Sequence, residues 1–283
     1  KTREKWVEYF NSQDYDVILT TASLSLRLAM IAPRLKAATI GWQHNCYDGY
    51  LHVKPVVFWQ QENLLQQYLP NLDRYIVLSD YDKRDYMEKL GIDCEVKINP
   101  RSFVSEKKCD VKSKRFLMAT RFVYAKGLDL MMESFEEFCK EDSEWELDII
   151  GDGDLFDQIR ADAKKRHLEK RVHFVGYTNE PEKYYLNSSV FLLPSRWEGW
   201  PMVIMEAFEF GLPVIAYHMG AMDLIIDDGK TGFLPEAFDP HKFAQAMLKL
   251  AHDEELRARM SANAIAKSDD FSIDEAVKEW DGL

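Results

Sequence analysis

After residue 114, short apolar runs rich in β-branched residues alternate regularly with longer amphipathic segments. The pattern predicts strands over 115–119, 147–151, 172–175, 190–193, 213–217 and 232–234, and helices over 127–140, 153–167, 180–187, 201–210, 220–227 and 239–252. Strands that alternate with helices form a parallel sheet covered by helices, and right-handed crossovers make it doubly wound. Ligands of such sheets bind beyond the carboxyl ends of the strands.

The first hundred residues also indicate an α/β arrangement. Strand-like runs occur at 16–19, 39–42, 75–78 and 95–98, and helical segments fall between them, for example 54–68 and 80–90. The chain shows no internal repeat and no low-complexity tract. We therefore expect an α/β fold throughout, with parallel sheets in both halves.

The stretch Ser195–Gly220 concentrates groups that could bind a ligand. Glu198 lies in a predicted loop, and Pro201 suits the first turn of a helix because its missing N–H has no partner there. Glu206 falls one to two turns into that helix, which Gly211 ends. Helix N-termini attract phosphate, and carboxylates accept hydrogen bonds from hydroxyls. A ligand that contains a sugar, a ribose and a diphosphate would use all three features if they converge on one site.

The same stretch resembles the E-x7-E motif of retaining nucleotide-sugar glycosyltransferases of the GT-B fold, most closely family 4. Four further blocks follow the order of that family: FLMATRFVYAKG at 116–127, LDIIGDG at 147–153, VHFVG at 172–176 and VFLLPS at 190–195. Two glutamates at this spacing are common, whereas five ordered blocks are specific. One departure is Thr120, where the family usually has glycine.

The resemblance implies two Rossmann-like, doubly wound domains that face each other across a cleft. It implies a partial acceptor-side domain over 1–108, a nucleotide-sugar domain over 109–269, and a closing helix over 270–283 that crosses back towards the first domain. The family's glycine-rich loop near the start of the first domain is absent before Asp16. We therefore expect this N-terminal domain to be incomplete in the chain.

Four residues are expected to act in catalysis. The resemblance assigns Arg121 and Lys126 to the donor diphosphate, where fixed cations stabilise the charge that develops on the leaving group. It assigns Glu198 to the hydroxyls of the donor sugar. His44, after the strand-like run at 39–42, is the best match for a family histidine that faces this sugar, with an ordinary loop histidine as the alternative.

Further residues are expected to bind the donor. The resemblance assigns Glu206 to the ribose hydroxyls and Tyr177 to the base, although a rim or core aromatic is an equal reading of Tyr177. The glycines Gly151 and Gly153 suit a close backbone approach to the nucleotide. The loop and helix start are expected to cradle phosphate or sugar through their backbone, at Gly199, Trp200, Pro201 and Met202.

The sequence predicts no metal and no cofactor. Asp152 and Asp154 form a D-x-D string, which binds a divalent metal in the other large glycosyltransferase fold. Here the string lies in a glycine turn, which fits a backbone role better. The substrate is then the nucleoside-diphosphate sugar alone, and the resemblance points to a UDP-sugar.

Charge argues against nucleic acid as a partner. The net charge is −12, and residues 1–110 hold 15 basic and 15 acidic residues, so the whole excess lies in the remainder. Basic residues cluster around the expected linker, and a solvated linker is favoured over a membrane-surface patch: Lys97, Arg101, Lys107, Lys108, Lys112, Lys114 and Arg115. Peripheral contact with a membrane stays open as an alternative.

The expected location is the cytoplasm, including the inner face of the plasma membrane. The four cysteines are scattered without metal or redox spacing and indicate reduced thiols. Residues 1–10 are polar and aromatic and do not resemble the apolar core of a secretory signal.

We therefore expect a retaining hexosyltransferase that uses a glycan or lipid-linked acceptor, in bacterial surface polysaccharide synthesis. A nucleotide-sugar epimerase of the same fold, and an inactive nucleotide-sugar-binding fragment, are the alternatives. Products formed from UDP-sugars with and without an acceptor separate the three.

Overall fold

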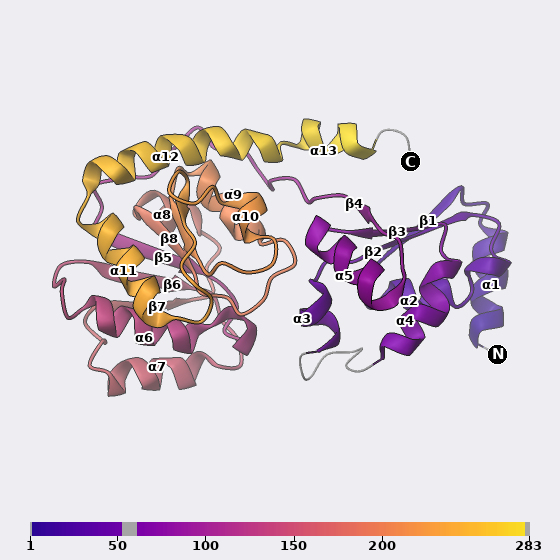
Figure 1. The fold of residues 1–283 in the computed structure, drawn as a ribbon, viewed down its shortest axis with the longest axis horizontal. Coiled ribbons are helices and arrows are strands. Elements are labelled where there is room, and N and C mark those ends of the chain that lie inside the picture. Colours follow the sequence, from indigo (N-terminus) through magenta and orange to yellow (C-terminus); the bar gives the residue numbers. More distant parts are fainter. Residues whose placement is uncertain (1, 53–60, 281–283) are drawn as a thin grey trace. The chain divides into compact units, whose positions relative to one another are not determined.

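The structure, a computed structural model, describes residues 2–52 and 61–280. The chain divides into two compact units (Figure 1). The first comprises Lys1–Asn99, Glu198–Trp200 and Lys278–Leu283, and the second comprises Pro100–Trp197 and Pro201–Val277. The predicted helix over 54–68 lies outside the described residues as far as residue 60.

The first unit contains a parallel sheet of four described strands in the order β1-β2-β3-β4. The strands are β1 (Val17–Thr21), β2 (Ala38–Trp42), β3 (Arg74–Val77) and β4 (Glu95–Val96). The helices are α1 (Thr2–Ser12), α2 (Ser23–Ala29), α3 (Tyr47–Leu51), α4 (Glu62–Tyr68) and α5 (Asp80–Leu90), with short 3₁₀ turns η1 (Ala32–Arg34) and η2 (Leu69–Asn71).

Helix α5 shows why these segments form helices where they do. The Ser79 hydroxyl oxygen accepts a hydrogen bond from the Asp82 amide at 3.1 Å, which satisfies an amide of the first turn that has no partner within the helix. Gly91, in the left-handed conformation (φ 67°), ends the helix. Between these caps, Tyr86 is fully buried and joins the core of the first unit.

The second unit contains a parallel sheet of six described strands in the order β10-β9-β8-β5-β6-β7. They are β5 (Arg115–Ala119), β6 (Glu146–Ile150), β7 (Val172–Gly176), β8 (Val190–Leu193), β9 (Val214–Ala216) and β10 (Gly232–Phe233). The chain runs outward from β5 to β7, returns to β8 beside β5, and continues the other way. The strand order therefore reverses between β5 and β8, where doubly wound sheets place their ligands.

The helices of this unit are α6 (Leu128–Phe138), α7 (Phe156–Lys165), α8 (Glu182–Leu186), α9 (Met202–Glu209), α10 (Met222–Ile225), α11 (Pro240–Ala251), α12 (Glu254–Ser268) and α13 (Ile273–Trp280). Helix α13 continues beyond the last residue of the unit, Val277. Two short 3₁₀ turns are η3 (Tyr124–Lys126) and η4 (Asp269–Phe271). Figure 1 shows α6 and α7 on one face of the sheet and α8, α9 and α12 on the other. The strands β8 and β9 are buried throughout, as expected for central strands of a sheet covered on both faces.

The predicted strands are all present, with ends that differ by one or two residues at most positions. Pro201 precedes the first helical residue of α9 instead of lying in the first turn. Helices α2 and α3 lie between predicted strands, where helical segments were expected without stated ranges, whereas α1 and α12 were not predicted. Helix α12 consists largely of alanine, serine and charged residues, so it lacks the strong apolar periodicity on which the prediction depends.

Candidate functional site

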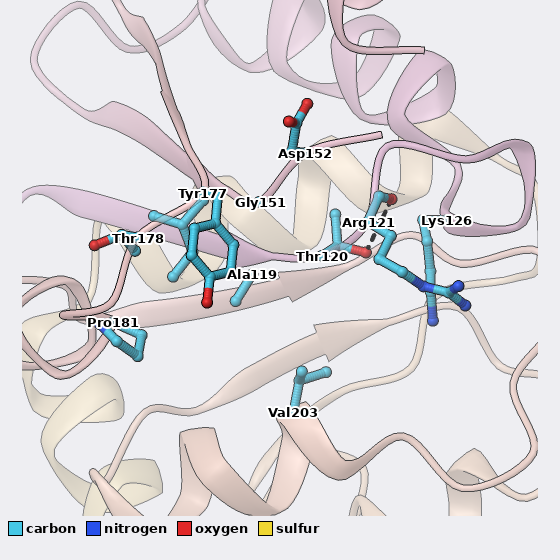
Figure 2. A pocket seen from close by; sticks show the side chains of 11 residues that line it. Ala119, Thr120, Arg121, Lys126, Gly151, Asp152, Tyr177, Thr178, Pro181 and Val203 are labelled. Carbon is cyan, nitrogen blue, oxygen red and sulfur yellow. Dashed lines mark hydrogen bonds between the residues drawn. The ribbon is translucent and has the colours of Figure 1, made fainter. Parts of the chain in front are cut away.

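A cavity of about 430 Å³ lies at the carboxyl ends of β5 and β6 (Figure 2). The loop after β5 and the loop after β7 form two of its walls, and Val203 in the first turn of α9 contributes to another. The described residues that line it are Ala119, Thr120, Arg121, Lys126, Ile150, Gly151, Asp152, Tyr177, Thr178, Pro181 and Val203. The cavity thus occupies the place where a doubly wound sheet binds ligands.

Two cations line the cavity. Figure 2 shows the side chains of Arg121 and Lys126 extending in the same direction from the loop after β5. Arg121 is exposed, and among residues 2–52 and 61–280 it has no ion pair. Lys126 is half-buried at the end of the 3₁₀ turn η3. The cavity therefore presents positive charge to an anionic ligand.

The two glycines after β6 are required by the protein's own backbone. Gly151 and Gly153 have φ values of 124° and 153°, which disfavour other residues. A Cβ atom at Gly151 would lie 1.8 Å from the carbonyl oxygen of Thr120, and one at Gly153 would lie 2.8 Å from that of Phe122. Close approach of the loop after β5 is therefore one reason for both glycines. The expected close approach of a nucleotide to Gly151 and Gly153 stays a prediction.

Asp152 of the D-x-D string helps to hold this turn. Its carboxylate accepts a hydrogen bond from the Gly153 amide at 2.8 Å, and its carbonyl oxygen accepts one from the Phe122 amide at 2.9 Å. Asp152 therefore has a local structural role in this turn.

A second cavity, of about 720 Å³, adjoins the first, because Pro181 lines both. Glu206 of α9 lines it, and its carboxylate accepts a hydrogen bond from the Tyr185 hydroxyl at 3.0 Å. Burial raises the pKa of Glu206. Tyr185 is fixed in turn by stacking on Phe191 and Phe210, with ring centroids 5.8 and 5.0 Å away. A rigid, partly desolvated carboxylate of this kind is suited to accept hydrogen bonds from ligand hydroxyls.

His44 follows β2 in the first unit, and its side chain is exposed. Its amide donates a hydrogen bond to the side-chain oxygen of Gln43 at 2.9 Å, and burial lowers the pKa of its imidazole. The segment Glu198–Trp200 belongs to the same unit, and a Cβ atom at Gly199 would lie 2.8 Å from the His44 carbonyl oxygen. The structure thus brings the histidine loop and the glycine of the E-x7-E motif together.

The predicted site residues therefore fall into three groups. Arg121, Lys126, Gly151 and Tyr177 line the first cavity, Glu206 lines the second, and His44 lies with Glu198, Gly199 and Trp200 in the first unit. Gly153, Pro201 and Met202 are not among the described residues that line either cavity.

Arg196 and Asp129 form an ion pair that was not predicted, and Arg196 also bonds to the turn that ends in Lys126. Arg196 directly follows the block at 190–195, and Asp129 lies two residues after the block at 116–127, but their pairing across 67 residues has no periodic signal in the sequence. Among the described residues, no helix is both long enough and apolar enough to cross a membrane.

Three comparisons relate the chain to known proteins. It is 28% identical over 274 residues to an uncharacterized glycosyltransferase of Haemophilus influenzae, a match that covers 94% of this chain and 75% of the relative. It is 28% identical over 166 residues to the poly(glycerol-phosphate) alpha-glucosyltransferase of Bacillus subtilis, covering 58% of this chain and 24% of that enzyme. A mutant of S. aureus TarM, solved in complex with Fondaparinux, alpha-GlcNAc-glycerol and UDP, superposes with a TM-score of 0.82 at 21% identity, over 97% of this chain and 57% of TarM.

These matches establish the fold and the family. The structural likeness to TarM confirms the predicted GT-B class of α/β fold with parallel sheets. The chain spans only part of the length of each relative. The family description "Glycosyl transferases group 1" matches residues 102–267, which is more than half of the chain. The protein therefore belongs to the group 1 glycosyl transferases.

Proposed function

We propose that this protein transfers a hexose from a nucleoside-diphosphate sugar, with UDP as the nucleotide, to a hydroxyl of a glycan or lipid-linked glycan, with retention of anomeric configuration. The observation that carries the proposal is the first cavity, which places Arg121 and Lys126 at the point where the strand order of the sheet reverses.

The two cations suit a diphosphate. When the bond between sugar and diphosphate breaks, negative charge grows on the leaving group. Fixed cations stabilise this charge more in the transition state than in the ground state, so they accelerate the step. The guanidinium of Arg121 can bind two phosphate oxygens at once, whereas the ammonium of Lys126 acts as a point charge.

Other residues are proposed to bind the remaining parts of the donor. Glu206 is the proposed ligand of the ribose hydroxyls, because its carboxylate is held in place by Tyr185. Tyr177 lines the first cavity and is 78% exposed, so its ring offers a stacking surface for the base at the rim. We assign the donor sugar to Glu198, with His44 facing it. The backbone at Gly199, Trp200, Pro201 and Met202 is the proposed cradle for phosphate or sugar.

The names of the relatives fit the proposal. UDP was present in the TarM crystal, and the B. subtilis enzyme is named for an alpha-glucosyl product and an anionic polymer acceptor. Retention follows if the donor is α-linked, as nucleoside-diphosphate glucose is. We propose family 4, front-face attack without a protein nucleophile, and action in the cytoplasm on a bacterial surface polysaccharide or a related polymer.

We also propose that no metal takes part. Arg121 and Lys126 supply the positive charge that a divalent cation supplies in other transferases, and Asp152 already serves its own turn.

The test is incubation of the chain with UDP-, GDP- and ADP-hexoses, with and without glycan and polyol-phosphate acceptors, followed by analysis of products. Transfer from one donor with an α-configured product supports the proposal. Conversion of a UDP-sugar without an acceptor would instead indicate an epimerase. Binding of UDP with neither transfer nor hydrolysis would indicate an inactive nucleotide-sugar-binding fragment.

A further inference from the structure

The loops after β5 and β8 leave the sheet in opposite directions. The two strands are hydrogen-bonded neighbours, but β5 leads to α6 on one face and β8 leads to α9 on the other (Figure 1). Loops that diverge in this way open the crevice in which ligands bind. The loop after β5 carries both cations of the first cavity, so its position relative to the rest of the site depends on contacts outside the sheet ladder.

Arg196, in the loop after β8, makes such a contact with the start of α6. Its guanidinium binds both carboxylate oxygens of Asp129, with Nη1–Oδ1 and Nη2–Oδ2 distances of 2.8 and 2.6 Å. The Arg196 side chain is 13% exposed. A bidentate pair in this geometry fixes direction as well as distance.

The same arginine also holds the turn that ends in Lys126. Its Nη1 donates to the carbonyl oxygen of Tyr124 at 2.9 Å, and its main-chain amide donates to that of Ala125 at 2.7 Å. Its guanidinium carbon lies 4.0 Å from the centre of the Tyr124 ring, a cation–π contact. Arg196 therefore binds the two residues that directly precede Lys126 and the acidic residue three positions after it.

Gly127 brings the two loops into direct contact. It has a φ of 61°, and a Cβ atom there would lie 2.0 Å from the carbonyl oxygen of Pro194. The ion pair is stable against titration: burial alone would raise the pKa of Asp129, but the hydrogen bond and charge of Arg196 outweigh burial and lower that pKa. Both partners therefore carry their charges at neutral pH.

From these contacts we infer that Arg196, paired with Asp129, is a positioning residue that sets where the Lys126 ammonium meets the diphosphate. Arg196 connects the loops after β5 and β8, where the strand order reverses, and donates hydrogen bonds to two consecutive carbonyl oxygens of η3. The inference rests on the proposed function, since it requires that Lys126 binds the diphosphate. Arg196 itself touches no substrate in this account and acts through Lys126.

The test measures binding of UDP and of inorganic pyrophosphate to the full chain by calorimetry. The variants are Arg196→Gln, Arg196→Lys, Asp129→Asn, Lys126→Gln and the double variant Lys126→Gln/Arg196→Gln. The matched control is Arg115→Gln, because Arg115 also binds both oxygens of one aspartate, Asp148, at 2.9 and 3.1 Å, but at the amino end of β5. Thermal unfolding of each variant checks the fold, and Asp129→Asn serves if Arg196→Gln does not fold.

We expect Arg196→Gln and Asp129→Asn to weaken both ligands roughly tenfold, a coupling typical of residues in contact. Arg196→Lys should recover little of the lost affinity, because an ammonium group cannot bind both carboxylate oxygens in the bidentate geometry of a guanidinium. In the Lys126→Gln background, Arg196→Gln should add almost nothing, because its effect passes through Lys126. If Arg196 had only a general structural role, the affinity losses of Lys126→Gln and Arg196→Gln would instead multiply in the double variant.

Three results would overturn the inference while the proposed function stands: unchanged affinity in both Arg196→Gln and Asp129→Asn, multiplying losses in the double variant, or an equal loss in Arg115→Gln. If the wild-type chain binds neither UDP nor pyrophosphate, the proposed function fails first, and this inference fails with it.

Discussion

The basic residues near the start of the second unit and Arg121 of the first cavity have opposite surroundings. In the first group, each cation meets a carboxylate: Arg101 and Lys108 with Glu209, Lys107 with Glu182, Lys112 with Glu254, Lys114 with Glu144, and Arg115 with Asp148. Arg121, in contrast, has no ion pair within the described part of the chain.

The difference separates charge that builds the protein from charge available to a ligand. In the sequence these paired residues form a basic cluster, for which a membrane-surface patch was the alternative to a solvated linker. In the structure their positive charge is balanced by neighbouring carboxylates. This favours the reading of that segment as structural. Arg121 follows a buried strand in a loop after β5, where nothing in the described structure balances it. A cation in that position needs an anion from outside to be balanced.

Removing a cavity cation should have the largest effect. Arg121→Ala or Lys126→Ala should lower kcat about 10²–10³-fold, equivalent to about 2–4 kcal/mol, because the lost interaction is strongest in the transition state. Steady-state kinetics of each variant measures this. Lys112→Ala, which removes an exposed paired cation, is the control and should leave kcat unchanged. Wild-type kinetics in both Arg121→Ala and Lys126→Ala would show that the cavity cations matter no more for catalysis than the paired basic residues do.

The structural group should instead respond in stability. Glu209 is 2% exposed and binds Arg101, Lys108 and the Ser105 amide. Glu209→Gln should lower the free energy of unfolding by about 3 kcal/mol, because it removes the buried charge with which Arg101 and Lys108 pair. Urea unfolding measures this, and Glu182→Gln at the exposed pair with Lys107 should change it by less than about 1 kcal/mol.

The same carboxylate gives a pH dependence. Burial alone would raise the pKa of Glu209, but the Ser105 amide and Lys108 outweigh burial, and the pKa is lowered. A group with a lowered pKa in the folded state stabilises the fold fully above its unfolded pKa and loses that contribution as the pH falls through the folded value. Stability of the wild type should therefore decline on acidification, and Glu209→Gln should flatten this part of the curve. If Glu209→Gln leaves the decline of stability on acidification unchanged, the proposed role of Glu209 is contradicted.

The two glutamates of the motif test the boundary between binding and catalysis. Glu206→Gln should weaken UDP and UDP-sugar alike, roughly tenfold, because the ribose does not react and a charge-assisted hydrogen bond is lost. Glu198→Gln should leave UDP affinity nearly intact and reduce turnover or discrimination between donor sugars. Calorimetric titration with UDP decides between them.

Tyr185→Phe is the control for Glu206, because it removes the hydrogen bond at 3.0 Å while keeping the carboxylate. If Tyr185→Phe loses as much affinity as Glu206→Gln, then the hydrogen bond that orients the Glu206 carboxylate contributes as much to UDP binding as its charge does. If Glu198→Gln loses UDP binding and Glu206→Gln keeps it, the two assignments are reversed.

The order of strands and helices could be predicted from the sequence, because local composition identifies buried strands. The run VFLL, for example, forms the fully buried strand β8. The gathering of Arg121 and Tyr177 at one cavity also followed from a general rule, since the carboxyl ends of parallel strands share one edge. What could not be read were interactions between distant segments. The pairing of Arg196 with Asp129 and the packing of Gly151 on Thr120 depend on which loops become neighbours, and no single-sequence pattern encodes that.

The smallest expected effect is that of metal removal. Activity should survive EDTA, because the positive charge needed by the diphosphate is proposed to come from Arg121 and Lys126. Asp152→Asn should be nearly neutral as well, since an amide oxygen can still accept the hydrogen bond from the Gly153 amide. The measurement is turnover in EDTA, followed by addition of Mg²⁺ or Mn²⁺. If EDTA abolishes turnover and either ion restores it, the two cations do not supply all the charge. Arg121 would then differ from the paired basic residues because it shares its ligand with a metal. Loss of that restoration in Asp152→Asn would identify the carboxylate that holds the ion.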